Sequence, residues 1–134
     1  MKKCLVLFSF AVGLLFVNSQ NISAQTKKLL VFKKGVAIVT SIIKGNESKT
    51  YYLKVKKDTD MEIFIEEEEK RPKFTLYKPN GKLFYDDNSV NRGDAFDLMD
   101  VLEDAGIYKI VVKLPDDLQS ETKPIKFTLK LVLK

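Results

Sequence analysis

Hydrophobic and polar residues alternate with a period of two along much of this chain. The clearest example closes the sequence, where every second residue from Ile125 to Leu133 is apolar and most residues between them are polar. Successive side chains of a β-strand point to opposite faces, so this pattern predicts a strand with one buried face. Shorter segments with the same period predict three further strands, at residues 51–56, 61–66 and 74–77.

Other strands are predicted from composition and from the turns around them. Residues 36–43 are rich in β-branched side chains and lie between two glycines, and residues 107–114 form another apolar segment after a turn. β-branched residues favour strands, and glycine marks turns. Residues 79–81, Pro-Asn-Gly, have the composition of a turn, which makes residues 82–85 the second arm of a hairpin.

Two segments are less regular. Residues 29–32 predict a short strand, and residues 96–102 fit either one helical turn or an irregular strand. No long helical pattern is present, and turns recur at roughly ten-residue intervals, which is typical of a β-sandwich or barrel. We therefore predict an all-β fold, an antiparallel, jelly-roll-like β-sandwich of about eight strands, in a single domain over residues 25–134.

The first 24 residues have the order of a secretory signal peptide. Met1-Lys2-Lys3 is basic, residues 5–17 are almost all apolar, and a polar stretch leads to Ala24. The apolar run is shorter than the roughly 20 residues that a membrane-spanning helix needs, so we expect cleavage after Ala24 rather than retention as an anchor. The sequence therefore predicts a periplasmic or secreted protein that meets the membrane only transiently, through residues 1–24.

Removal of this segment excludes several kinds of chemistry. Cys4 is the only cysteine and the chain has no His, so the 110 residues that remain contain neither. They cannot build a Ser-His-Asp site, a Cys-His site or the usual zinc site. The formal net charge falls from +5 to +3, without the clustered basic residues of a nucleic-acid binder. We expect a binding protein that is not an enzyme, needs no cofactor and does not bind nucleic acid.

Acidic residues gather in three segments that we expect to be loops. Adjacent carboxylates repel one another and stay solvated, and such a loop suits a basic partner. Clustered carboxylate oxygens also suit Ca²⁺, although the spacing differs from that of an EF-hand and a solvated acidic loop is the alternative. The candidate binding residues are Glu66, Glu67, Glu68, Glu69, Asp116 and Asp117, and the candidate calcium ligands are Asp86, Asp87 and Asp94.

Tyrosines form a second set of candidates. Tyr51 and Tyr52 are neighbours in one predicted strand, so they point to opposite faces and one of them faces outward. An exposed tyrosine can stack on a sugar or anchor a protein interface. We take Tyr51 and Tyr77 as candidate binding residues, with ordinary cross-strand packing as the alternative.

Several segments resemble those of bacterial pre-peptidase C-terminal domains. Residues 74–81, FTLYKPNG, resemble their x-L-Y-x-P-x-G hairpin, and residues 102–112, LEDAGIYKIVV, resemble their L-x-x-x-G-x-Y-x-I-x-V strand. Residues 127–129 fit their last strand. The resemblance implies a jelly-roll-like β-sandwich and a non-catalytic binding or processing module, which in that family is usually attached to a secreted protease.

Nearly the whole predicted domain is also similar to the stand-alone periplasmic inhibitors of g-type lysozyme. Residues 32–35, 43–45 and 52–57 occur in the order and spacing of that group. The resemblance implies the same sandwich, with loops that insert into the lysozyme cleft. The chain departs from the group at Asn46, where an aromatic is expected, and at residues 115–121, where an acidic loop replaces a basic one.

These observations favour an exported, non-enzymatic β-sandwich that binds a macromolecule through the loops between its strands. The partner that the resemblance implies is a protein, and in the narrowest form a g-type lysozyme. The alternative is a glycan of the cell envelope or matrix, which the outward-facing tyrosines would contact.

Overall fold

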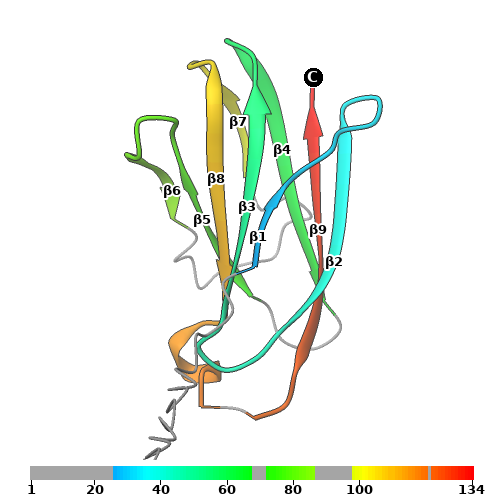
Figure 1. The fold of residues 1–134 in the computed structure, drawn as a ribbon, viewed down its shortest axis with the longest axis vertical. Helices are drawn as coiled ribbons and strands as arrows, with labels where there is room; N and C mark the ends of the chain where they lie inside the picture. Colours follow the sequence, from blue (N-terminus) through cyan, green and yellow to red (C-terminus); the bar gives the residue numbers. More distant parts are fainter. Residues whose placement is uncertain (1–25, 68–71, 87–97, 121) are drawn as a thin grey trace, which may run out of the picture.

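Two β-sheets packed face to face make up the structure (Figure 1). The computed structural model describes residues 26–67, 72–86, 98–120 and 122–134. Sheet A has five strands in the order β1-β3-β8-β5-β6, and sheet B has four in the order β2-β9-β4-β7. The predicted β-sandwich is confirmed, and it has nine strands among the described residues rather than about eight.

The strands follow the sequence patterns closely. Those of sheet A are β1 (Thr26–Leu29), β3 (Ser48–Val55), β8 (Gly106–Lys113), β5 (Lys73–Tyr77) and β6 (Leu83–Asp86). Those of sheet B are β2 (Val36–Ile43), β9 (Ile125–Leu133), β4 (Thr59–Glu67) and β7 (Leu98–Leu102). Every pair of neighbouring strands is antiparallel except β1 and β3, which run parallel. The predicted antiparallel β-sandwich is therefore confirmed, with β1–β3 as the one parallel pair among the described strands.

Three local predictions change in the structure. The short strand expected at residues 29–32 lies earlier, because β1 ends at Leu29, while Leu30 is buried beyond it. The ambiguous segment 96–102 forms strand β7 from Leu98 onward, and its first two residues lie outside the described part. Asp116–Leu118, expected as part of a loop, forms a short 3-10 helix, η1.

The inner faces of the two sheets form one hydrophobic core. The strict alternation predicted for β9 is realised, because Phe127, Leu129 and Leu131 are buried and the residues between them are not. Full burial of a Leu or Phe side chain stabilises the fold by about 1.5–3 kcal/mol. A shift of β9 by one residue would expose these side chains, so the pattern favours the observed register over the adjacent registers. Core residues that are less than 2% exposed come from both sheets and include Leu53, Met61, Phe74, Tyr108 and Ile110.

The connections between strands gather at two ends of the sandwich (Figure 1). β2 ends at Ile43, opposite the start of β9, and β8 ends at Lys113, opposite the starts of β3 and β5. We call this end the loop end, and its described part comprises residues 44–47, 72, 114–120 and 122–124 with the adjoining strand ends. The C-terminus and the tight turns of the β5–β6 and β7–β8 connections lie at the opposite end.

Candidate functional site

The loop end joins segments from both sheets. The β2–β3 turn is closed by hydrogen bonds from the Glu47 N–H to the Lys44 carbonyl (3.1 Å) and from the Lys44 N–H to the Glu47 carboxylate (3.2 Å). Gly45, which has a positive φ of 59°, is close enough to the β8–β9 connection that a Cβ there would lie 3.5 Å from the Gln119 carbonyl oxygen. The two connections therefore form one continuous surface.

The β8–β9 connection is held in place by its own hydrogen bonds. The Gln119 side-chain amide donates to the Leu114 carbonyl and to the Asp116 carboxylate, each over 3.2 Å. Leu114 is fully buried, and Leu118 packs partly against the core. These contacts anchor η1 (Asp116–Leu118) at both its ends, so the connection presents its outer side chains from a fixed backbone.

The acidic candidates of the loops are only partly described. Asp116 and Asp117 are exposed on η1, and Glu66 is exposed near the end of β4. The strand continues through Glu67, so the expected four-residue acidic loop begins later than predicted, and Glu68 and Glu69 lie outside the described residues. Lys44, Lys73 and Lys113 belong to the same end, which therefore carries both signs of charge.

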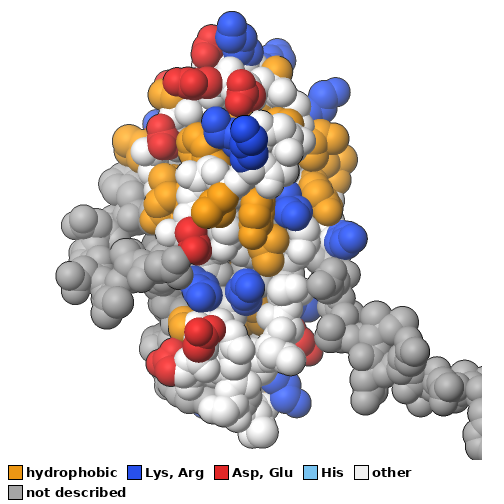
Figure 2. Space-filling view, turned by 90° about the vertical axis from the view of Figure 1, so that its left-hand side faces the viewer, with side chains coloured by type: hydrophobic (Ala, Val, Ile, Leu, Met, Phe, Trp, Pro, Cys, Tyr) orange, Lys and Arg blue, Asp and Glu red, His pale blue; other side chains and the backbone are white. Residues whose placement is uncertain are grey.

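Charges of both signs also mix elsewhere on the surface. On the side of the molecule that Figure 2 shows, hydrophobic side chains lie between Lys or Arg and Asp or Glu side chains. Neither sign forms a continuous patch on this face, which agrees with the modest formal net charge of the chain.

The two tyrosine candidates differ in their positions. Tyr51 lies in the core, 2% exposed, where its hydroxyl bonds the Ser41 side chain and burial raises the pKa of the phenol. Its burial is incompatible with direct contact to a partner, so we do not keep it as a candidate. Tyr77 lies on the outer face of sheet A, half-buried, with the Lys109 ammonium 4.5 Å from the centre of its ring.

Tyr77 belongs to a row of side chains that crosses the whole of sheet A. The strand registers place five residues side by side on the five strands, in the order Leu29, Tyr52, Lys109, Tyr77 and Leu83. With a strand spacing of about 4.8 Å, this tyrosine row is about 19 Å wide. Leu29 and Leu83 at its ends are 58% and 56% exposed. The row is an outer surface of apolar and aromatic groups with one cation at its centre.

The proposed calcium ligands are not brought together in the described residues. Asp86, at the end of β6, accepts a hydrogen bond from the Thr75 hydroxyl (3.3 Å), and Asp87 and Asp94 lie outside the described part. Across the described residues, no group of three or more Asp, Glu, His or Cys side chains is placed to hold a metal ion.

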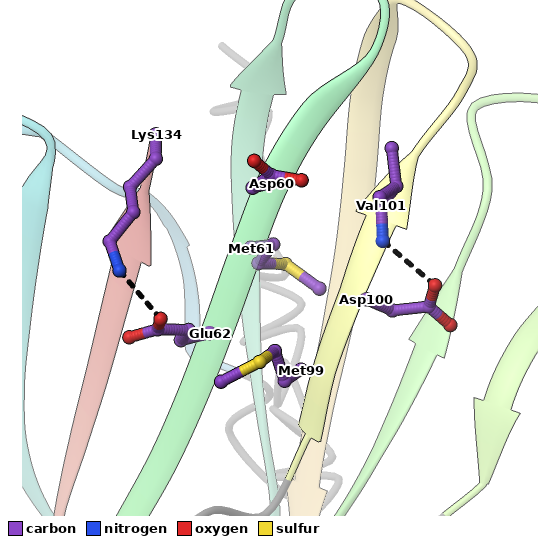
Figure 3. Close-up of a pocket in the computed structure, with 7 residues that line it drawn as sticks. All are labelled: Asp60, Met61, Glu62, Met99, Asp100, Val101 and Lys134. Carbon is purple, nitrogen blue, oxygen red and sulfur yellow. Dashed lines mark hydrogen bonds and ion pairs between the residues drawn. The ribbon is translucent and has the colours of Figure 1, made fainter.

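A shallow hollow of about 480 Å³ lies on the outer face of sheet B (Figure 3). Its lining includes three acidic residues, Asp60, Glu62 and Asp100, and the exposed side chains of Met99 and Val101, 61% and 42% exposed. The sequence-based reasoning missed it, because β4 and β7 meet only through tertiary pairing. The apolar residues Met99 and Val101 of β7 were the one feature of the sequence that could have indicated this hollow.

Two acidic residues of the hollow, Glu62 and Asp100, are bound by different neighbours. The Glu62 carboxylate accepts a 2.7 Å hydrogen bond from the Lys134 ammonium, which raises the pKa of that ammonium. The Asp100 carboxylate points away from Glu62 and accepts a hydrogen bond from the Val101 N–H over 2.7 Å (Figure 3). Two-carboxylate hydrolysis needs both groups to flank the bond to be broken, whereas these two carboxylates are turned away from each other (Figure 3).

Comparison with known proteins shows which solved structures this fold is similar to. No protein-family model and no curated protein matches the sequence. Among solved structures, the fold is similar to PliG of Aeromonas hydrophila, a periplasmic inhibitor of g-type lysozyme, with a TM-score of 0.69 and 18% identity over 81% of this chain and 96% of that one. PliG of Salmonella Typhimurium gives a TM-score of 0.64 and 19% identity over 81% of this chain and 99% of that one.

The fold is also similar to the pre-peptidase C-terminal domain of a Bacillus anthracis collagenase, with a TM-score of 0.55 and 13% identity over 83% of this chain and 95% of that one. Both resemblances predicted from the sequence are thus confirmed at the level of the fold. Among the residues that the structure describes, none belongs to a helix long and apolar enough to cross a membrane.

Proposed function

We propose that this protein is exported, that residues 1–24 are removed as a signal peptide, and that residues 25–134 bind another protein through the loop end. In the narrowest form, the partner is a g-type lysozyme, which the protein inhibits without being an enzyme itself. The observation that carries this proposal is that the sandwich matches almost the whole length of two periplasmic inhibitors of g-type lysozyme.

The geometry of the loop end supports a binding role. Its two described connections each join one sheet to the other and approach each other at Gly45 and Gln119, while strands and the buried Leu114 fix their positions. Loops on a rigid scaffold bind with little loss of conformational entropy, because their backbone is ordered before the partner arrives. Exposed Asp116 and Asp117 offer negative charge to a basic partner, which accelerates encounter more than it strengthens the complex.

The lysozyme form is tested by an inhibition assay. The full chain is expressed with its signal, and the exported product is purified and added to g-type lysozyme acting on cell walls. We expect lysis to slow in proportion to the protein added, until the inhibitor equals the enzyme. Full lysis with the protein in excess would exclude g-type lysozyme as the partner. The partner of the loop end would then have to be sought among other proteins of the cell envelope.

A pair of charge-reversal variants tests the loop end itself. Asp117→Lys reverses an exposed charge on η1, and Glu103→Lys makes the same change at the opposite end of the sandwich. We expect Asp117→Lys to weaken inhibition about tenfold, since a charge that faces the partner helps to steer and orient it. Equal loss in both variants, or none in either, would contradict binding through the loop end.

The proposed export has a separate readout. Mass spectrometry of the protein recovered from the periplasm or medium should give the mass of residues 25–134. Recovery of the intact chain from the membrane fraction would instead indicate a retained anchor.

The tyrosine row favours a second candidate function, the binding of a cell-envelope glycan. Sugars stack on aromatic faces, and Tyr52 and Tyr77 lie on either side of Lys109 on the outer face of sheet A. We expect binding to a glycan array that Tyr52→Ala and Tyr77→Ala abolish. Phe64→Ala is the matched control, because Phe64 is a half-buried aromatic on the outer face of sheet B with a lysine 5.6 Å from its ring. An empty array would remove this candidate.

A further inference from the structure

Strand β2 (Val36–Ile43) forms one edge of sheet B and pairs only with β9. Its eight residues, VAIVTSII, contain no charge and no proline. Ile38 and Ile42 face outward and are 62% and 55% exposed. Long, uncharged and apolar edge strands are rare on monomeric proteins, because they are templates for pairing with another strand.

The hydrogen-bond pattern shows which backbone groups of β2 are open. The Leu133 N–H donates to the Gly35 carbonyl (2.8 Å), so residues 35 and 133 form a hydrogen-bonded pair. In an antiparallel ladder such pairs recur at every second residue, which directs residues 37, 39, 41 and 43 of β2 toward β9. The N–H and C=O groups of Ile38, Thr40 and Ile42 therefore point to the open side, and no described residue pairs with them.

Turns limit this open stretch at both ends. Val36 exchanges backbone hydrogen bonds with Lys33, over 2.9 and 3.1 Å, and Lys44 is bonded to Glu47 in the β2–β3 turn. The open groups of residues 38, 40 and 42 are therefore arranged symmetrically about Thr40. A two-fold axis through Thr40 would place every open donor opposite an open acceptor.

We infer that β2 is a self-association site, at which two copies of this chain pair their β2 strands antiparallel with Thr40 opposite Thr40 of the second copy. Each Ile38 then lies opposite Ile42 of the other copy, and about six hydrogen bonds join the two strands. The two four-stranded sheets become one continuous sheet of eight strands. This inference does not depend on the proposed function.

Charge selects a second copy of this edge as the occupant. The other edge strands that the structure describes each carry charge: β1 has Lys27 and Lys28, β6 has Asp86, and β7 has Asp100. Like charges directly opposite each other destabilise a cross-strand pair. Two paired β2 strands have no such charges, because the strand carries none. On the same face, Lys126 and Lys130 of β9 lie beside Ile42 and Ile38, and those of the two copies are about 14 Å apart, beyond the Debye length of about 8 Å at physiological salt.

The association should be weak and reversible. Pairing one edge strand covers less surface than the roughly 1,200–2,000 Å² of a standard stable interface, so we expect a dissociation constant of about 10 μM to 1 mM. Sedimentation velocity over that concentration range measures it on the exported protein. We expect the average mass to rise from one chain toward two, and a constant single-chain mass throughout would overturn the inference.

Lysine substitutions locate the contact. In a dimer, Thr40→Lys sets two ammonium groups opposite each other and Ile42→Lys replaces an apolar contact, so each should raise the dissociation constant about tenfold. Val101→Lys is the matched control, because it adds the same charge on the outer face of sheet B at its other edge strand, β7. Equal effects of the edge and control variants would contradict pairing through β2.

A cross-link tests the register independently of charge. In the inferred pair, the Cα atoms of residue 40 and its counterpart are about 5.5 Å apart, a distance that a disulfide spans. Cys4→Ser removes the only natural cysteine, and Thr40→Cys in that background should give a disulfide-linked dimer on mild oxidation. Val101→Cys should remain monomeric. Failure of Thr40→Cys to cross-link in a folded protein, as judged by circular dichroism, would refute this register.

Discussion

Tyr108 illustrates how one residue joins a strand to the turn before it. Its ring lies fully buried near the start of β8, and its hydroxyl donates to the Asp104 carbonyl over 2.9 Å. A tyrosine near a strand start that bonds back to the chain a few residues upstream also occurs in immunoglobulin-like sandwiches. The bond satisfies a polar atom that would otherwise be buried without a partner.

Removing this hydroxyl should destabilise the fold modestly. We expect Tyr108→Phe to lower the free energy of unfolding by about 1 kcal/mol, because the Asp104 carbonyl loses its donor while the ring stays in place. Urea denaturation measures the change. Tyr52→Phe, on the outer face of sheet A, serves as the control and should leave the unfolding midpoint almost unchanged.

Buried tyrosines also predict how stability depends on pH. Burial raises the pKa of both Tyr51 and Tyr108 above the usual value of 10. Above pH 10 the unfolded state therefore loses protons that the folded state keeps, so the free energy of unfolding falls as pH rises. We expect stability to be maintained below pH 10 and to decline above it.

Denaturation curves at pH values from 8 to about 11 check this dependence, since the unfolded phenols ionise near pH 10. The Tyr51→Phe, Tyr108→Phe double variant is the control, because it has lost both raised pKa values. Its stability should decline less steeply above pH 10. An identical slope in the two proteins would show that other groups cause the decline.

The turn between β1 and β2 and the turn between β5 and β6 each need a glycine. The two glycines share one reason and differ in a second. Gly35 and Gly81 have φ values of 78° and 83°, where side chains are strained. A Cβ at Gly35 would lie 2.5 Å from the Leu133 carbonyl oxygen, whereas a Cβ at Gly81 would meet nothing within 4 Å. Backbone conformation thus explains both glycines, but close approach of another strand explains only Gly35.

The two glycines make a matched pair of variants. Gly81→Ala should cost about 1 kcal/mol of stability, because it only places a side chain at positive φ. Gly35→Ala should cost about 2 kcal/mol more, since β9 must also move away from the turn. Thermal unfolding of both variants measures the difference. Equal losses would show that the contact with Leu133 relaxes without cost.

Sequence patterns identified most elements because their periodicity is a local property. β4 and β9 were predicted by alternation alone, and the same alternation could have placed Tyr51 correctly, since it shares the inward phase of Leu53 and Val55. β7 was ambiguous because three of its five residues are exposed on an edge strand, which weakens the period of two. The parallel direction of β1 could not be predicted, because it depends on which strand β1 meets.

At the scale of the whole molecule, the loop end and the β2 edge are separate surfaces. In the inferred dimer, the two β2 strands are antiparallel, so the loop ends of the two copies point in opposite directions. Each copy could then hold its own partner without obstruction from the other. Function at the loop end and association at the edge are expected to be independent.

This independence is testable with variants already described. Thr40→Lys should inhibit g-type lysozyme fully while its self-association weakens about tenfold, and Asp117→Lys should inhibit about tenfold more weakly while still dimerising as before. Lysis assays and sedimentation on the same preparations provide both readouts. A simultaneous loss of both properties in either folded variant would show that the two surfaces are coupled.

The sequence by itself determined the class of fold, most of the strands and the absence of thiol and imidazole chemistry beyond residue 24. Those properties follow from local periodicity and from composition, which need no knowledge of distant contacts. Only the tertiary structure decided that β1 runs parallel to β3, that Tyr77 lies beside Lys109 on the outer face of sheet A, and that β2 is an edge of sheet B. Each depends on which segments pack together, because hydrogen bonding and burial between distant strands set their order and direction.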